Sequence, residues 1–68
     1  MRNTVKKIID ILYDIPNMSK ACMGMIIDPI DTEEQANRLL KYLEENKDNK
    51  EIMRVSHLLR YKHEIIGN

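Results

Sequence analysis

Apolar residues recur along three stretches of the chain with the spacing of amphipathic helices. Over residues 4–14, 32–46 and 50–66 they fall mostly three or four positions apart, so that one face of each segment is apolar. Asn3 or Thr4 is the expected N-cap of the first helix, and Gly67 is the expected C-cap of the last. The pattern therefore predicts helices over these three ranges.

The starts of the last two helices carry the sharpest local signals. Asp31 and Asp48 are each followed three residues later by a glutamate, Glu34 and Glu51, and each has a second capping residue beside it. This spacing suits a capping box, in which side chains at a helix start satisfy free backbone N–H groups. Because the turn around Lys47 is short, we expect the last two helices to pack as an antiparallel hairpin.

The segment 17–27 is ambiguous between a short helix and a strand. Asn17 could cap a helix, in which four residues keep helical spacing: Met18, Ala21, Cys22 and Met25. Residues 25–27 would also suit a strand, but a lone strand has no partner in this chain, so we favour a helix that ends before Asp28. The fold class expected is all-α, with residues 1–68 as a single domain and a small bundle of three to four short helices.

Composition limits how this bundle can be stabilised. A chain of 68 residues buries a modest core, and without Phe or Trp that core must come from aliphatic side chains and Met. The formal net charge is zero, but residues 28–51 carry eight acids against four bases, whereas both flanking segments are mildly basic. Small helical folds often gain stability by oligomerising, and an acidic middle between basic ends suits such contacts. No apolar run has the length of a membrane span and no signal peptide is recognisable, so we expect a cytoplasmic protein without membrane contact.

The residues that carry catalytic or metal chemistry are sparse. His57 and His63 are six apart and would point about 120° away from each other on one helix, so they cannot hold a single ion together. Cys22 lies on an apolar stretch, which favours an inert thiol. Gly24 and Gly67 are the only glycines, so no phosphate-binding loop is present. We therefore expect no enzymatic activity, no catalytic residue, no cofactor, no metal and no small-molecule substrate.

Protein association is the function that the sequence favours. The chain is rich in methionine, whose flexible thioether adapts to irregular interfaces. Several apolar positions fall outside the main helical stripes, which suggests more apolar surface than one small bundle can cover. We expect a homo-oligomer or a complex with a protein partner, with an interface that includes Met23, Met25, Ile26, Met53 and Tyr61.

Nucleic-acid binding is the alternative. The last helix carries a basic face that a helix–turn–helix arrangement would present to a major groove: Arg54, His57, Arg60 and Lys62. Against this, the net charge is zero and the preceding helix is acidic at both ends, whereas DNA-binding domains are usually basic.

Overall fold

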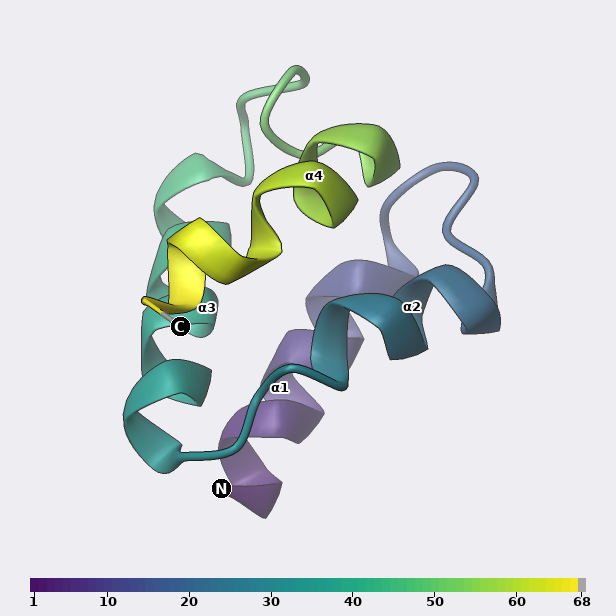
Figure 1. The fold of residues 1–68 in the computed structure, drawn as a ribbon. Coiled ribbons are helices and arrows are strands. Elements are labelled where there is room, and N and C mark those ends of the chain that lie inside the picture. The colour runs from purple at the N-terminus through teal and green to yellow at the C-terminus, as the bar shows by residue number, and fades with distance from the viewer. Residues whose placement is uncertain (68) are drawn as a thin grey trace.

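Residues 1–67, which the computed structural model describes, form four helices and no strand. They are α1 (Arg2–Tyr13), α2 (Lys20–Ile27), α3 (Glu33–Asn46) and α4 (Val55–Ile66). α1 packs against α3, α3 against α4, and α2 bridges α4 and α1 (Figure 1). The predicted all-α bundle is therefore confirmed, and residues 20–27 of the ambiguous segment form a helix that ends before Asp28, as favoured.

The core lies where the four helices face one another. α3 contributes Ala36, Leu39 and Leu43, which are all fully buried and fall on one face of the helix. The remaining buried side chains come from the other helices and from two connections: Ile8, Leu12, Ile15, Met23, Ile26, Ile30, Leu58 and Ile66. No charged or polar side chain of residues 1–67 is buried among them. The core is thus aliphatic with one methionine, as the composition requires.

α3 and α4 form the expected antiparallel hairpin. Late in α3, the Tyr42 hydroxyl shares a hydrogen bond of 2.8 Å with Nε2 of His57, near the start of α4. Earlier in α3, the Arg38 guanidinium donates to the carbonyl oxygen of Ile66, at the end of α4, over 3.2 Å. The late part of α3 thus contacts the start of α4, and the earlier part of α3 contacts the end of α4. The two helices are therefore antiparallel.

The capping box at the start of α3 uses different residues from those predicted. Thr32 is the N-cap: its hydroxyl accepts from the backbone N–H of Gln35 at 3.1 Å, and the Gln35 side chain accepts from the Thr32 N–H at 3.1 Å. Gln35 also accepts from the N–H of Asp31 at 2.6 Å. Glu34 instead pairs with Arg38 at 2.6 Å. The prediction of Asp31 and Glu34 was wrong by one residue, because the extended backbone that brings a side chain over the first turn belongs to Thr32.

α4 begins at Val55, five residues later than the sequence predicted. Residues 50–53 form turns, and the extended backbone of Arg54 (φ −93°, ψ 143°) separates them from the helix. Arg54 occupies the N-cap position but makes no side-chain capping hydrogen bond. The predicted start at Lys50 was therefore wrong, because the helical pattern continued across a residue whose backbone is extended.

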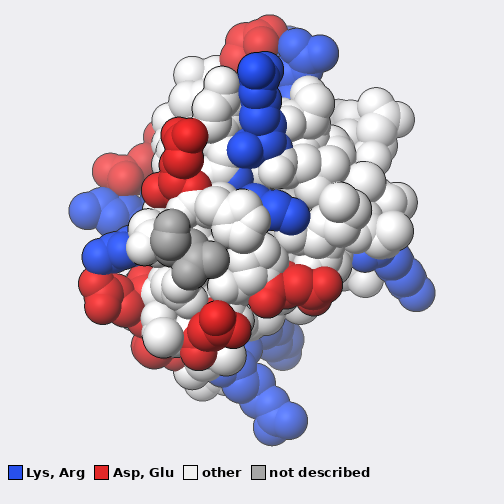
Figure 2. Space-filling model, in the orientation of Figure 1, with Lys and Arg blue, Asp and Glu red and all other residues white. Residues whose placement is uncertain are grey.

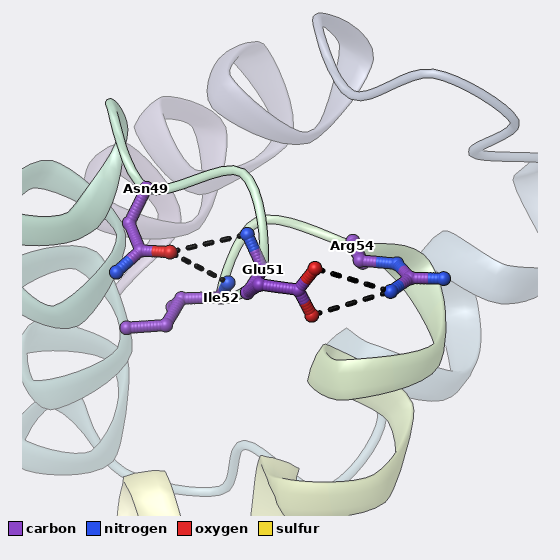
Figure 3. A network of polar contacts seen from close by, with 4 residues as sticks. All are labelled: Asn49, Glu51, Ile52 and Arg54. Carbon is purple, nitrogen blue, oxygen red and sulfur yellow. Dashed lines mark hydrogen bonds and ion pairs between the residues drawn. The ribbon is translucent and has the colours of Figure 1, made fainter.

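The side chain that organises this turn is Asn49 rather than Asp48. Its Oδ1 accepts from the backbone N–H groups of Glu51 at 3.1 Å and of Ile52 at 3.2 Å (Figure 3). Glu51 in turn pairs with the Arg54 guanidinium at 3.2 Å (Figure 3). An asparagine side chain that bonds two and three residues ahead supports a turn as readily as a helix start, which explains the misinterpretation.

α1 begins earlier than expected, at Arg2, with Met1 as N-cap and no capping side chain. Thr4, a predicted cap, instead donates from its hydroxyl to Glu33 Oε1 at 2.5 Å, and the terminal ammonium of Met1 also pairs with Glu33. The hydrogen bonds from the terminal ammonium and then from Thr4 lower the pKa of Glu33. This cluster joins the start of α1 to the start of α3.

The face of α2 that packs against the core is not the face that the sequence pattern indicated. Ser19, not Asn17, is its N-cap, and its hydroxyl accepts from the N–H of Cys22 at 3.1 Å. Met23 and Ile26 are buried, whereas Ala21 and Met25, part of the predicted stripe, are exposed. Seven of the eight residues of α2 are uncharged and mostly apolar, so the periodicity could not distinguish its two faces.

Candidate protein-binding groove

An apolar groove lies between the start of α4 and the connection from α1 to α2 (residues 14–19). Its volume is about 840 Å³, larger than the hollow of about 500 Å³ beside Tyr42. We call it the α4 groove, and it is lined by Pro16, Asn17, Lys50, Met53, Arg54, Val55, Ser56 and Leu59. Four of these eight side chains are apolar, and Met53, Val55 and Leu59 are only partly buried. The groove is therefore a hollow in which partly buried apolar side chains of this bundle remain in contact with solvent.

Two irregular segments create the groove. On one side, the connection from α1 to α2 turns at Asn17, whose φ of 67° lies in the left-handed region that asparagine adopts more readily than most residues. On the other side, the break at Arg54 sets the turn of residues 50–53 beside the first turn of α4. Helix packing thus stops short of these segments and leaves their apolar side chains without a covering layer.

The charges at the groove are positive. Lys50 is exposed and makes no hydrogen bond or ion pair within residues 1–67. Arg54 is also exposed, and its pairing with Glu51 at 3.2 Å is an exposed contact of the kind that contributes about 0–1 kcal/mol. In Figure 2 most acidic side chains lie on the left, over α3, whereas the upper right, towards the start of α4 and the α1–α2 connection, is mostly uncharged. The groove thus has an apolar floor and two exposed cations, Lys50 and Arg54, beside it.

The predicted interface residues do not lie together. Met23 and Ile26 are core residues, 7% and 0% exposed, so the expectation that they form surplus surface is corrected. Met25 is exposed on α2, Met53 lines the α4 groove, and Tyr61 is partly buried on α4. Of the predicted set, Met53 alone among the described residues belongs to the groove.

Tyr61 belongs to an aromatic cluster that joins α3 and α4. The His57 ring lies between Tyr42 and Tyr61, with ring centroids at 6.4 Å and 4.8 Å. Partial burial raises the pKa of the Tyr42 phenol, and its hydroxyl is bonded to His57 as described above. His57 is already engaged in this contact, so the cluster stabilises the packing of α4 against α3.

The basic residues of the alternative prediction are partly occupied within the chain. Lys62 donates from Nζ to the backbone carbonyl of Met25 at 2.7 Å and so ties α4 to α2. Arg60 lies over the Tyr61 ring at 5.6 Å from its centroid. Arg54, His57 and Arg60 line one small hollow of about 250 Å³, and Lys62 does not. The full lining is Glu51, Arg54, Ser56, His57, Arg60 and Tyr61. The acid among these residues reduces the positive potential that a phosphate backbone would need.

The described residues also bear on metal binding and on membrane spanning. No group of three or more His, Cys, Asp or Glu side chains there is arranged to hold a metal ion. No helix within residues 1–67 combines the length and the hydropathy needed to cross a bilayer.

Sequence reasoning missed most of the α4 groove. Pro16 and Asn17 are residues typical of a turn. The other groove residues that were not predicted lie within the range of the predicted last helix, where nothing in the sequence indicates a turn: Lys50, Val55, Ser56 and Leu59. A break in that helix at Arg54 was needed to expose them together. Comparison of the chain with protein-family models, with curated proteins and with solved structures finds no match.

Proposed function

We propose that this protein is a non-enzymatic cytoplasmic binding protein that associates with a protein, either a second copy of itself or a different partner, through the α4 groove. The observation that supports the proposal is the groove itself: about 840 Å³ lined by Pro16, Met53, Val55 and Leu59, with Lys50 and Arg54 beside them. The proposal keeps the predicted class of function and Met53 of the predicted interface, and replaces the predicted residues of α2 and Tyr61 by residues at the start of α4 and in the α1–α2 connection.

Binding at the α4 groove would be driven by the removal of apolar surface from water. Each square ångström of apolar surface covered by a partner contributes about 25 cal/mol, and the partly buried groove residues still carry such surface. The volume of about 840 Å³ falls within the range of about 300–1,000 Å³ of small-molecule pockets, so a large side chain of a partner has room to enter. The cations beside it would then select partners that bring acids next to their apolar residues.

A site-specific photo-crosslinker tests the proposal in the living source cell. Ser56 lines the groove and is exposed, so a photo-reactive amino acid there touches no core residue. Asn37 is exposed on α3, outside the groove lining, and is the matched control for the same substitution. We expect a discrete protein adduct from position 56 and none from position 37. No adduct from position 56, or equal adducts from both, would overturn the proposal.

Nucleic-acid binding is the weaker candidate. Arg54 and Arg60 are exposed and line one hollow, which favours an anion there, but Lys62 is engaged with Met25. Steeply salt-dependent binding of duplex DNA that falls when both arginines are replaced by glutamine would favour this candidate. Absence of binding in low salt would exclude it.

A further inference from the structure

Tyr13 is the most exposed of the large apolar side chains that the structure describes, at 63%. It lies in the last turn of α1, and Asp10 and Asp14 are three residues before it and one after it. Residues at i, i+3 and i+4 are neighbours on a helix, so the three side chains share one surface, which we call the Tyr13 face. All three are exposed.

The acids of the Tyr13 face lack compensation within residues 1–67. Neither Asp10 nor Asp14 has an ion pair or hydrogen bond from its side chain there. Asp14 is the C-cap of α1, and the last turn of α1 contains no basic residue. A negative charge at a helix C-terminus is unfavourable, because the macrodipole places partial negative charge there. An external cation would relieve this repulsion.

The Tyr13 face and the α4 groove are complementary in apolar character and in charge. The face offers one large aromatic side chain with two acids beside it, and the groove offers an apolar hollow with Lys50 and Arg54 at its edge. Entry into the groove would cover the exposed 63% of the Tyr13 side chain, which is apolar apart from its hydroxyl. Its phenolic hydroxyl can keep a polar partner at the edge of the groove.

The positions of the two surfaces also suit a closed dimer. Tyr13 precedes Pro16, which lines the groove, by three residues, so the chain separates them by at most about 11 Å. In a two-fold dimer the same patch meets itself, and a face beside its own complementary groove forms two identical contacts across the axis. A formal net charge of zero means that two copies do not repel each other as a whole.

We propose that the α4 groove receives the Tyr13 face of a second copy, giving a two-fold dimer in which the Tyr13 side chain enters the apolar hollow and Asp10 and Asp14 meet Lys50 and Arg54. This inference rests on the proposed function and identifies its partner as the chain itself. A different protein with an acidic, aromatic segment is the competing occupant and is an outcome of the test.

A charge exchange between the two surfaces tests the dimer. The face variant carries Asp10→Lys with Asp14→Lys, and the groove variant carries Lys50→Glu with Arg54→Glu; all four sites are exposed, so both proteins should fold. Each variant alone brings like charges together and should be a monomer. Mixed in equal amounts, they restore opposite charges at both contacts and should form a heterodimer.

The readout is light scattering after gel filtration, at two concentrations differing about tenfold, with helicity checked by circular dichroism. Wild type should show twice the chain mass of 8.1 kDa at the higher concentration, and Tyr13→Ser should show the chain mass at both. The matched control, Glu44→Lys with Glu45→Lys on the exposed side of α3, should remain a dimer.

Three results would overturn the inference: a wild type that is monomeric at both concentrations, a Tyr13→Ser variant that still dimerises, or a mixture of the charge variants without heterodimer. The crosslinking at Ser56 separates these failures from failure of the proposed function. A monomeric wild type whose position 56 captures a different protein refutes the dimer and leaves the groove as a binding site. A dimer that forms without any adduct from position 56 refutes the groove as its interface.

Discussion

Replacing Thr32 by alanine should destabilise the protein, whereas replacing Asp31 should not do so to the same degree. The Thr32 hydroxyl accepts the Gln35 N–H at 3.1 Å, and alanine removes that acceptor. The Asp31 carboxylate accepts no hydrogen bond within residues 1–67, and only its backbone N–H is engaged, by the Gln35 side chain at 2.6 Å. The pair of substitutions therefore separates a true N-cap from a neighbouring acid.

The magnitude follows from the hydrogen bond that is lost. Loss of a Thr N-cap costs about 1 kcal/mol, within a range of about 0.5–2 kcal/mol. The reciprocal bond from the Thr32 N–H to Gln35 at 3.1 Å is a backbone contact that alanine can retain, so the cost should not exceed this range. For Asp31→Ala the expected loss is only the attraction of its charge to the start of α3, a few tenths of a kcal/mol that salt screens. For a domain of this size, 1 kcal/mol corresponds to about 4–8 °C in the melting temperature.

Thermal and urea unfolding followed by circular dichroism at 222 nm measure both quantities, in about 0.1 M salt and again in about 1 M salt. Thr32→Ser keeps a hydroxyl at the cap and should unfold close to wild type. Thr32 is not the N-cap that stabilises α3 if Asp31→Ala costs as much as Thr32→Ala in about 1 M salt, or if Thr32→Ser is as unstable as Thr32→Ala.

Further predictions concern the core, the hairpin and the pH dependence. Leu39 is fully buried, so Leu39→Ala should cost about 2–5 kcal/mol in urea unfolding, and Leu40→Ala, at a partly buried site, clearly less; equal costs would contradict the packing. Tyr42→Phe removes the 2.8 Å hydrogen bond to His57 and should cost about 0.5–1.5 kcal/mol by the same measurement. The terminal ammonium lowers the pKa of Glu33. The ionised Glu33 side chain therefore stabilises the fold above pH 4.5, the ordinary pKa of a glutamate, and this stabilisation is lost as the pH falls through the lowered pKa of Glu33 in the folded state. Glu33→Gln should therefore reduce the decrease in unfolding free energy between about pH 6 and about pH 3, and an unchanged pH profile would contradict the contact.

The sequence predicted the helices where amphipathic spacing was unambiguous. α3 alternates buried and exposed residues clearly, with Leu39 and Leu43 fully buried and Glu44 and Glu45 exposed, and its range was predicted to within one residue. α2 carries apolar side chains on all sides, so its existence could be inferred but its buried face could not. Periodicity identifies a buried face only when the opposite face is polar.

The α4 groove could not be predicted for a different reason, which is that the pattern of apolar residues does not show where a helix is interrupted. Ile52, Val55 and Leu59 keep a helical spacing across Arg54, so the pattern gave no reason to stop the helix there. Asn49 holds the N–H groups of Glu51 and Ile52 within the turn, and the helix begins only after the extended backbone of Arg54.

That interruption has a consequence for function. A helix continued back to Lys50 would need helical backbone at Arg54, where the chain is instead extended, and the turn that carries Met53 to the groove would not exist. The surface proposed here for binding therefore depends on a turn whose determinants are polar and local, while the core that supports it depends on apolar periodicity. Asn49→Ala tests this dependence: it should weaken the turn and reduce crosslinking from position 56, while the buried residues of α3 remain packed. Undiminished crosslinking would show that the groove forms without this turn.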